Sequence, residues 1–263
     1  MLTSACCRGC KVKTVLTIDI GNSRIKWALW HQGQIVQAGE QAYDRHSPEL
    51  AFKAWLDLDR PEAVSVACVA GKSIEQALND WMQTNWSITP AYLATTCALN
   101  GVTNIYDDPE QYGVDRWAAL LGAHEICQQP VCVIDAGTAI TIDLMDAQGH
   151  HLGGRIMPGL AMMRAALSAG TAGIADSKGR IVEFASNTAD AVSSGTLHML
   201  HAALLEVCDS AREQLGNDMQ IIITGGTATE IMSLGNLPEM QYEPNLVLTG
   251  LHAAMSYQAK ASS

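Results

Sequence analysis

The first part of the chain alternates between apolar and polar positions. Residues 15–20 form a run rich in β-branched side chains, and a turn follows at Gly21 and Asn22. Apolar residues return at alternate positions within residues 25–29, before a second turn at residues 31–34. A period of two is typical of strands, and glycine beside asparagine is typical of the turns that join them. The pattern therefore predicts a β-hairpin.

A second segment, residues 131–152, repeats this layout. Asp19 corresponds to Asp135 and Gly21 to Gly137, and the members of each pair are 116 residues apart. One aspartate and glycine after a strand is common by chance. Two copies at a constant offset indicate an internal duplication.

Helices and strands alternate between and after the hairpins. Apolar residues at helical spacing predict helices at residues 48–58, 73–81, 114–127, 159–169 and 189–215. Short apolar runs predict strands at residues 63–69 and 220–224. This alternation indicates an α/β fold with mixed sheets. We expect a disordered N-terminal extension over residues 1–14 and two duplicated domains, residues 15–127 and 128–263.

The composition indicates a globular protein. Of 263 residues, 48% are hydrophobic and 16% are charged, so the chain can bury a large core. The formal net charge of −11 repels polyanions, which disfavours nucleic acid as a partner. Because no apolar run reaches the roughly 18 residues of a membrane span, no membrane association is expected.

The cysteines favour a reducing compartment, the cytoplasm. Five of them occur singly in apolar surroundings: Cys68, Cys97, Cys127, Cys132 and Cys208. Near the N-terminus, Cys6, Cys7 and Cys10 lie in a basic segment without the apolar core of a secretion signal. Cys7 and Cys10 have the spacing of half a zinc site, but no second pair follows.

The first hairpin turn carries groups suited to a phosphate. Gly21 lets backbone N–H groups approach an anion with no Cβ in the way, and Asn22 and Ser23 add side-chain donors. Asp19 would repel a phosphate directly but can hold Mg²⁺ through water. Lys26 either complements the phosphate charge or is an ordinary exposed strand lysine.

The second hairpin offers the same chemistry. Thr138 takes the place of Asn22 and can donate its hydroxyl to a β- or γ-phosphate. Asp135 is the counterpart of Asp19. Taken alone, Asp135 and Asp143 would also suit carboxylates that cap turns, but the duplication favours phosphate or cation binding for Asp135.

A glycine pair, Gly225 and Gly226, follows the strand at residues 220–224 and precedes a helix start at Thr227. Such a turn suits the adenine or ribose of a nucleotide, although it also occurs as a simple tight turn. The sequence contains no Gly-x-x-x-x-Gly-Lys-Ser/Thr motif, so a P-loop is not expected.

Residues 106–116 combine a loop with the start of a helix. Pro109 and Gly113 mark the loop, which places Asp115 and Arg116 in the first helical turn, where the helix dipole favours a carboxylate. From these residues alone, Asp115 is either a functional carboxylate or a first-turn acid that balances the dipole beside a solvated Arg116.

Tyr106, Pro109 and the run Gly113-Val114-Asp115-Arg116-Trp117 resemble the pantothenate-binding motif of type III pantothenate kinases. The resemblance extends from about residue 15 to residue 251 and includes GGRIMPGL (153–160), NTADAVSSG (187–195) and TGGTA (224–228). It implies the actin-like ATPase fold shared with sugar kinases, in which two RNase H-like domains face each other across a cleft.

The resemblance also implies a reaction, the ATP-dependent phosphorylation of pantothenate to 4′-phosphopantothenate in coenzyme A biosynthesis. Asp115 would accept the proton of the substrate hydroxyl, and the planar fork of Arg116 suits the substrate carboxylate. The implied ATP-binding residues are Asp19, Ile20, Gly21, Asn22, Ser23, Arg24, Ile25, Lys26 and Thr138. The implied substrate-binding residues are Tyr106, Gly113, Val114, Asp115, Arg116 and Thr188.

Cofactors and assembly follow from the same resemblance. ATP would arrive with Mg²⁺, held through water by Asp19, and a monovalent cation, K⁺ or NH₄⁺, would bind Asp135. Members of the family are typically homodimers, which would bring Thr188 close to the subunit contact. The apolar stripe of the helix at 189–215 suits core packing and dimer packing equally.

Two alternative functions stay open, a non-catalytic transcriptional accessory factor of the same family and a same-fold phosphotransferase or phosphatase acting on another substrate. An intact Asp115 favours an enzyme, and the 106–116 block favours pantothenate. The helical histidines His124, His198 and His201 lack partners for a metal site and are expected to be structural or surface residues. His150 and His151 are expected at a hairpin tip.

Overall fold

The computed structural model describes residues 14–175 and 178–261. Residues 1–13 of the predicted extension, which include Cys6, Cys7 and Cys10, lie outside the described residues. Thr14 is already the first residue of a strand.

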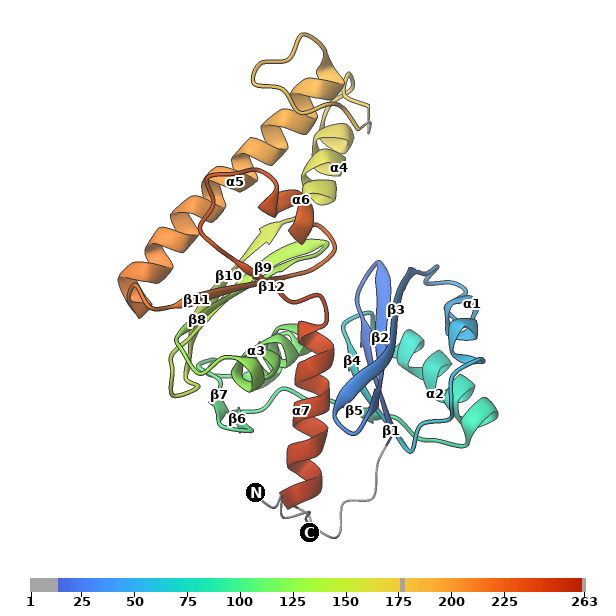
Figure 1. Ribbon diagram of the computed structural model, residues 1–263. Coiled ribbons are helices and arrows are strands. Elements are labelled where there is room, and N and C mark those ends of the chain that lie inside the picture. The colour runs from blue at the N-terminus through green and yellow to red at the C-terminus, as the bar shows by residue number, and fades with distance from the viewer. Residues whose placement is uncertain (1–13, 176–177, 262–263) are drawn as a thin grey trace, which may run out of the picture.

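Five strands form the first sheet, in the order β3-β2-β1-β4-β5 (Figure 1). They are β1 (Thr14–Ile20), β2 (Arg24–His31), β3 (Gln34–Ala42), β4 (Ala63–Cys68) and β5 (Ala91–Tyr92). β1, β2 and β3 are antiparallel neighbours, whereas β4 is parallel to both β1 and β5. The first predicted hairpin is thus confirmed as β1–β2, and it continues through the turn at Gln32 and Gly33 into β3.

The second sheet repeats this topology in the order β10-β9-β8-β11-β12. Its strands are β8 (Val131–Ala136), β9 (Ala139–Met145), β10 (His151–Pro158), β11 (Gln220–Thr224) and β12 (Gln241–Tyr242). β8 and β9 are the second predicted hairpin, and the parallel partner of β8 is β11. The identical order of the two sheets is the structural form of the duplication in the sequence.

All five predicted helices are present; three have ends within one residue of the predicted ones, α2 continues five residues beyond the predicted end, and the first is shorter than predicted. The helices are α1 (Glu49–Phe52), α2 (Lys72–Trp86), α3 (Val114–Ile126), α4 (Leu160–Gly170), α5 (Thr188–Leu215), α6 (Ala228–Met232) and α7 (Leu246–Ala261). The first predicted helix corresponds to α1 and a 3-10 turn that follows it at Lys53–Trp55. A second 3-10 turn spans Pro109–Gln111. Two short strands, β6 (Ala98–Leu99) and β7 (Val102–Thr103), pair with each other. α7 is not among the predicted helices.

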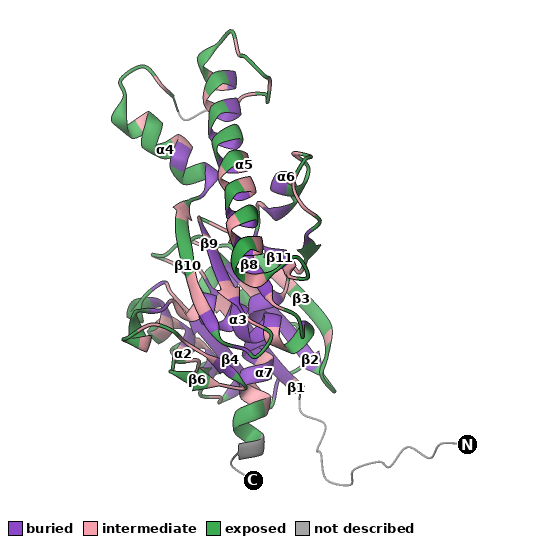
Figure 2. Cartoon of the chain, turned by 90° about the vertical axis from the view of Figure 1, so that its left-hand side faces the viewer, coloured by how far each residue is buried: buried purple, intermediate pink, exposed green. Residues whose placement is uncertain are grey.

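Three layers of apolar side chains hold the sheets and helices together. α1 and α2 cover one face of the first sheet, and α4, α5 and α6 cover the outer face of the second sheet. α3 and α7 lie between the two sheets (Figure 1). Figure 2 shows buried residues in this central region and exposed residues along much of α4 and α5, which extend beyond the sheets.

α7 belongs to the residues that the sequence assigns to the second domain, yet it packs against α3, β1 and β4. The last helix therefore returns to the first sheet, and the division at residues 127 and 128 stays a prediction. Within the described part of the chain, no helix combines the length and the apolar character that a membrane span requires.

Candidate active site

The two duplicated turns meet. The β1–β2 turn ends at Ser23 and the β8–β9 turn contains Thr138, and the two side-chain oxygens, Oγ and Oγ1, lie 3.1 Å apart. Each turn is closed by the backbone N–H of its glycine, Gly21 or Gly137. Ser23 and Thr138 are exposed, so hydroxyl donors from both halves of the molecule face the same space.

Two carboxylates lie at the strand ends beneath these turns. Burial raises the pKa of Asp19 to about 7, and the nearby charges of Asp135 and Asp115 add to the rise. Burial raises the pKa of Asp135 to about 6, with Lys26 opposing the shift and Asp115 adding to it. Three aspartates are therefore close enough to repel one another, and a bound cation would relieve that repulsion.

The glycine pair at the end of β11 lies beside this cluster. Gly225 has a φ of +95°, and a Cβ there would lie 2.5 Å from Oδ1 of Asp135. The hydroxyl of Thr227 donates a 2.8 Å hydrogen bond to the carbonyl of Ala136. The third glycine turn thus adjoins the second hairpin, and its contact with adenine or ribose stays a prediction.

Asp115 lies in the first turn of α3. Its Oδ1 accepts a 2.8 Å hydrogen bond from the backbone N–H of Arg116, and the absence of a Cβ at Gly113 leaves room for that oxygen. Burial raises the pKa of Asp115, while this hydrogen bond and the charge of Arg116 oppose the rise. The carboxylate is held against the helix start, near the charges of Asp19 and Asp135.

Arg116 has a carboxylate partner within the protein. Its Nη2 and Nε donate to the two carboxylate oxygens of Asp143, at 2.6 and 2.9 Å, and its Nη1 donates to the hydroxyl of Tyr106 at 3.2 Å. Arg116 is buried, which contradicts the alternative of a solvated arginine. The two guanidinium N–H groups that could bind a substrate carboxylate side by side already bind Asp143, so a substrate contact through Arg116 stays a prediction.

Asp143 and His151 are the residues that sequence reasoning missed. Both are buried, and His151 Nε2 lies 3.0 Å from Oδ1 of Asp143. His151 is the first residue of β10, and only His150 lies at the exposed tip. One signal was present, because an aspartate inside the apolar run of a strand requires a buried partner.

Thr188 lies apart from the two turns. It is the first residue of α5, whose first turns extend beyond the sheets in both views (Figures 1 and 2). Thr188 lines a cavity of about 690 Å³ between α4 and α5, together with Leu167 and Met199. No other predicted site residue lines this cavity.

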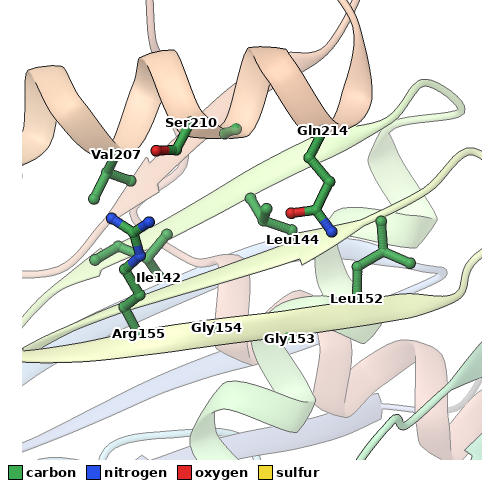
Figure 3. Close-up of a pocket in the computed structure, with 10 residues that line it drawn as sticks. Ile142, Leu144, Leu152, Gly153, Gly154, Arg155, Val207, Ser210 and Gln214 are labelled. Atoms are coloured by element: carbon green, nitrogen blue, oxygen red, sulfur yellow. The ribbon is translucent and has the colours of Figure 1, made fainter.

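A second cavity, of about 330 Å³, lies between β9, β10 and α5. Figure 3 shows Leu144, Arg155, Val207 and Gln214 around it. None of the predicted site residues lines it. Arg155 at this cavity forms an ion pair with Glu206, with 2.5 Å between Nη1 and Oε2.

The donor set at the strand ends fits a cation that shares its ligands with water and phosphate. Among residues 14–175 and 178–261, no three His, Cys, Asp or Glu side chains are grouped closely enough to hold a metal by themselves. Mg²⁺ bound to a nucleotide usually takes only one or two carboxylates and completes its shell with water and phosphate oxygens. Asp19 supplies one such carboxylate, and Asp135 lies close enough to raise its pKa.

Comparison with known proteins identifies close relatives of the chain. The profile of one family, type III pantothenate kinase, matches residues 15–210. A type III pantothenate kinase of Nitrosococcus oceani is 36% identical over 246 residues, which cover 90% of this chain and 92% of the relative. One from Halorhodospira halophila is 37% identical over 243 residues, covering 90% and 95% of the two chains.

Solved structures confirm the predicted actin-like, sugar-kinase-like fold. A putative Baf family transcriptional activator from Campylobacter jejuni superposes with a TM-score of 0.57 at 20% identity, covering 93% of this chain and 99% of the other. Component A of (R)-2-hydroxyglutaryl-CoA dehydratase from Acidaminococcus fermentans gives 0.52 at 13% identity, covering 95% and 100%. A ROK family glucokinase from Streptomyces griseus gives 0.50 at 13% identity, covering 94% and 99%. At these identities the likeness concerns the fold alone.

Proposed function

The chain belongs to the type III pantothenate kinase family, and we propose that it transfers the γ-phosphoryl group of ATP to the primary hydroxyl of pantothenate. The product is 4′-phosphopantothenate, and the reaction is the first step of coenzyme A biosynthesis. The observation that carries the proposal is the meeting of the two turns at Ser23 and Thr138, 3.1 Å apart, beside Asp19, Asp115 and Asp135.

The residues from Asp19 to Lys26, together with Thr138, bind the nucleotide phosphates in this proposal. Backbone N–H groups and the hydroxyls of Ser23 and Thr138 supply neutral donors, and Lys26 supplies a positive charge. Asp19 holds Mg²⁺ through water and Asp135 holds K⁺ or NH₄⁺. These cations neutralise phosphate charge when they are bound.

Asp115 orients the pantothenate hydroxyl and accepts its proton late in the transfer. An ordinary carboxylate is too weak a base to deprotonate an alcohol at the outset, so most of the rate comes from alignment and charge neutralisation. The raised pKa of Asp115 makes it a better late acceptor than an exposed aspartate. Tyr106 and residues 113–116 form the substrate-binding segment.

We also propose a cytoplasmic homodimer in which Thr188 reaches the active site of the second subunit. Support comes from the exposed apolar side chains on and near the arm formed by α4 and α5. They are Ile156, Met162, Leu167, Ile181, Phe184 and Met199. Phe184 is 92% exposed, a degree that a large aromatic side chain rarely shows without a partner.

A coupled ADP-release assay tests the function. ADP formation that requires pantothenate, and that K⁺ increases, supports the proposal. An accessory factor without catalysis would release no ADP, and a phosphotransferase for another alcohol would respond to that alcohol in place of pantothenate.

Asp115→Asn is the matched variant for this assay. We expect kcat to fall by about 10²–10⁴-fold because the proton acceptor is lost, while ATP binding, measured by calorimetry, stays close to wild type. Unchanged turnover in this variant would rule out the role given to Asp115.

A further inference from the structure

A buried ion pair lies directly behind the proposed proton acceptor. Arg116 follows Asp115 in the first turn of α3, and its side chain and that of Asp143 are only 6% and 4% exposed. Two parallel N–H···O bonds join them, at 2.6 and 2.9 Å. This two-point geometry fixes both the position and the plane of the guanidinium. Because burying a pair of charges brings little net stability, the pair is weak evidence of a purely stabilising role.

Further contacts hold the pair in place. Oδ1 of Asp143 also lies 3.0 Å from Nε2 of His151, whose side chain is 0% exposed. A hydrogen bond to the carboxylate oxygen requires the tautomer of His151 that has its proton on Nε2. On the other side, the guanidinium carbon of Arg116 lies 4.5 Å from the ring centre of Tyr112. Asp143 therefore contacts both Arg116 and His151 through its carboxylate.

The strands place this cluster on the sheet that carries the second turn. Asp143 lies in β9, with Val133 of β8 opposite it on one side and Gly154 of β10 on the other. A Cβ at Gly154 would lie 2.6 Å from Nη2 of Arg116, so the missing side chain lets the guanidinium approach the strand. The Arg116–Asp143 pair thus ties the start of α3 to the sheet that ends at Asp135 and Thr138.

We propose that Asp143 and His151 are positioning residues for phosphoryl transfer. They hold Arg116, and through it the first turn of α3, so that Asp115 keeps a fixed place relative to the Asp135–Thr138 turn. The inference rests on the proposed function. A misplacement of about 1 Å between reacting groups can cost on the order of 100-fold in rate. The loss falls on kcat, because both side chains are almost completely buried and so have no surface to offer a nucleotide.

His151→Phe, with His150→Phe as its matched control, tests the proposal. The two histidines are neighbours, but His150 is 56% exposed at its side chain and pairs with Asp146 at the surface. With pantothenate and ATP as substrates, we expect His151→Phe to lower kcat by about 10–100-fold and to leave the KM for MgATP within about two-fold. His150→Phe keeps wild-type kcat.

Two further substitutions of His151 distinguish a positioning role from a purely stabilising one. His151→Gln keeps an N–H donor that can reach Asp143, and His151→Asn carries the same donor on a shorter side chain. We expect Gln to retain most of kcat and Asn to lose it, when rates are expressed per folded enzyme measured by circular dichroism. A purely structural role would lower the melting temperature of the variants and leave kcat per folded molecule equal among them.

Several results would overturn the positioning role. They are a kcat within about two-fold of wild type in folded His151→Phe, an equal loss in His150→Phe, or failure of all three His151 variants to fold. A wild-type protein that does not phosphorylate pantothenate would overturn the proposed function, and the positioning role with it. An active wild type with unaffected variants would overturn the positioning role alone.

Discussion

At the scale of single residues, the clustering of aspartates matters most. Asp19 and Asp135 are only partly exposed, and desolvation together with nearby carboxylates raises the pKa of both. Such a cluster is unfavourable in a protein without ligands. Buried groups with perturbed pKa values that face a common space are typical of functional sites. The cluster is understandable if a cation and phosphate complete it.

Replacing Asp19 by Asn tests this view through stability. The pKa of Asp19 is about 7 in the folded protein against an ordinary 3.8, so its protonated form stabilises the fold fully below pH 3.8. That contribution is lost as the pH rises through about 7. At pH 8 we therefore expect Asp19→Asn to stabilise the nucleotide-free protein by on the order of 1–2 kcal/mol while abolishing turnover.

Thermal unfolding at pH 8 and at pH 4 provides the measurement. A gain of about 2–8 °C in melting temperature at pH 8 should shrink at pH 4, where the wild-type carboxyl is itself protonated. Asp57→Asn, at an exposed position, is the control and should leave both melting temperatures close to wild type. A destabilised Asp19→Asn protein at pH 8 would contradict the repulsion that we describe.

At the scale of elements, the contact between α3 and α7 holds the centre of the molecule. Gly250 of α7 lies against the backbone of Ala118, and Gly122 of α3 lies against the backbone of Leu246. Each glycine allows the other helix to approach more closely than any larger residue would. The position of α3 is therefore tightly restrained, and with it the first turn of the helix, which carries Asp115.

Gly250→Ala is expected to destabilise the protein. Its methyl group would overlap the carbonyl of Ala118, a backbone atom that cannot rotate away, so we expect a loss of about 2–3 kcal/mol in the free energy of unfolding. Gly170→Ala, at the end of α4 with no atom within 4 Å of the new methyl, is the control and should be neutral or slightly stabilising. Urea unfolding measures both, and equal stabilities would argue against close packing at Gly250.

At the scale of the whole molecule, the arm of α4 and α5 separates Thr188 from the other predicted site residues. α5 begins at Thr188 and runs back to the second sheet, where Leu204, Val207 and Cys208 are buried. The first turns of this helix extend beyond the sheets (Figure 2). In the proposed homodimer, they would meet the active site of the second subunit.

Combining an inactive variant with an impaired variant tests that arrangement. If each site combines Asp115 of one subunit with Thr188 of the other, a heterodimer of Asp115→Asn and Thr188→Ala chains contains one intact site. We expect co-expression of the two chains with different tags, followed by double purification, to restore about half of the wild-type kcat per dimer, since one of two sites is complete.

Each variant purified alone is the control for this experiment. Asp115→Asn alone should stay inactive and Thr188→Ala alone should stay impaired, and light scattering should give the mass of a dimer for both. A heterodimer no more active than its parents would place Thr188 in the site of its own chain or outside any site.

The sequence by itself determined the two hairpins and their turns, because alternation, glycine position and a constant offset are local properties. It also determined the place of Asp115 at a helix start, since Pro109 and Gly113 mark the loop before it. The family resemblance added the reaction. The predicted ends of α3, α4 and α5 also lie within one residue of the observed ends, whereas strand β3 was not predicted.

Only the tertiary structure decided which of these residues meet. Ser23 and Thr138 are 115 residues apart in the chain, and Arg116 and Asp143 are 27 apart, so no local pattern records either contact. α7 was not predicted because a helix buried between two sheets lacks the polar face that makes an apolar stripe recognisable in the sequence. Gly250, a residue that disfavours helices, lies within it. The sequence pattern suggested that Asp143 and His151 belong to turns. Packing between distant segments, which a local pattern does not encode, instead buries both side chains behind Asp115.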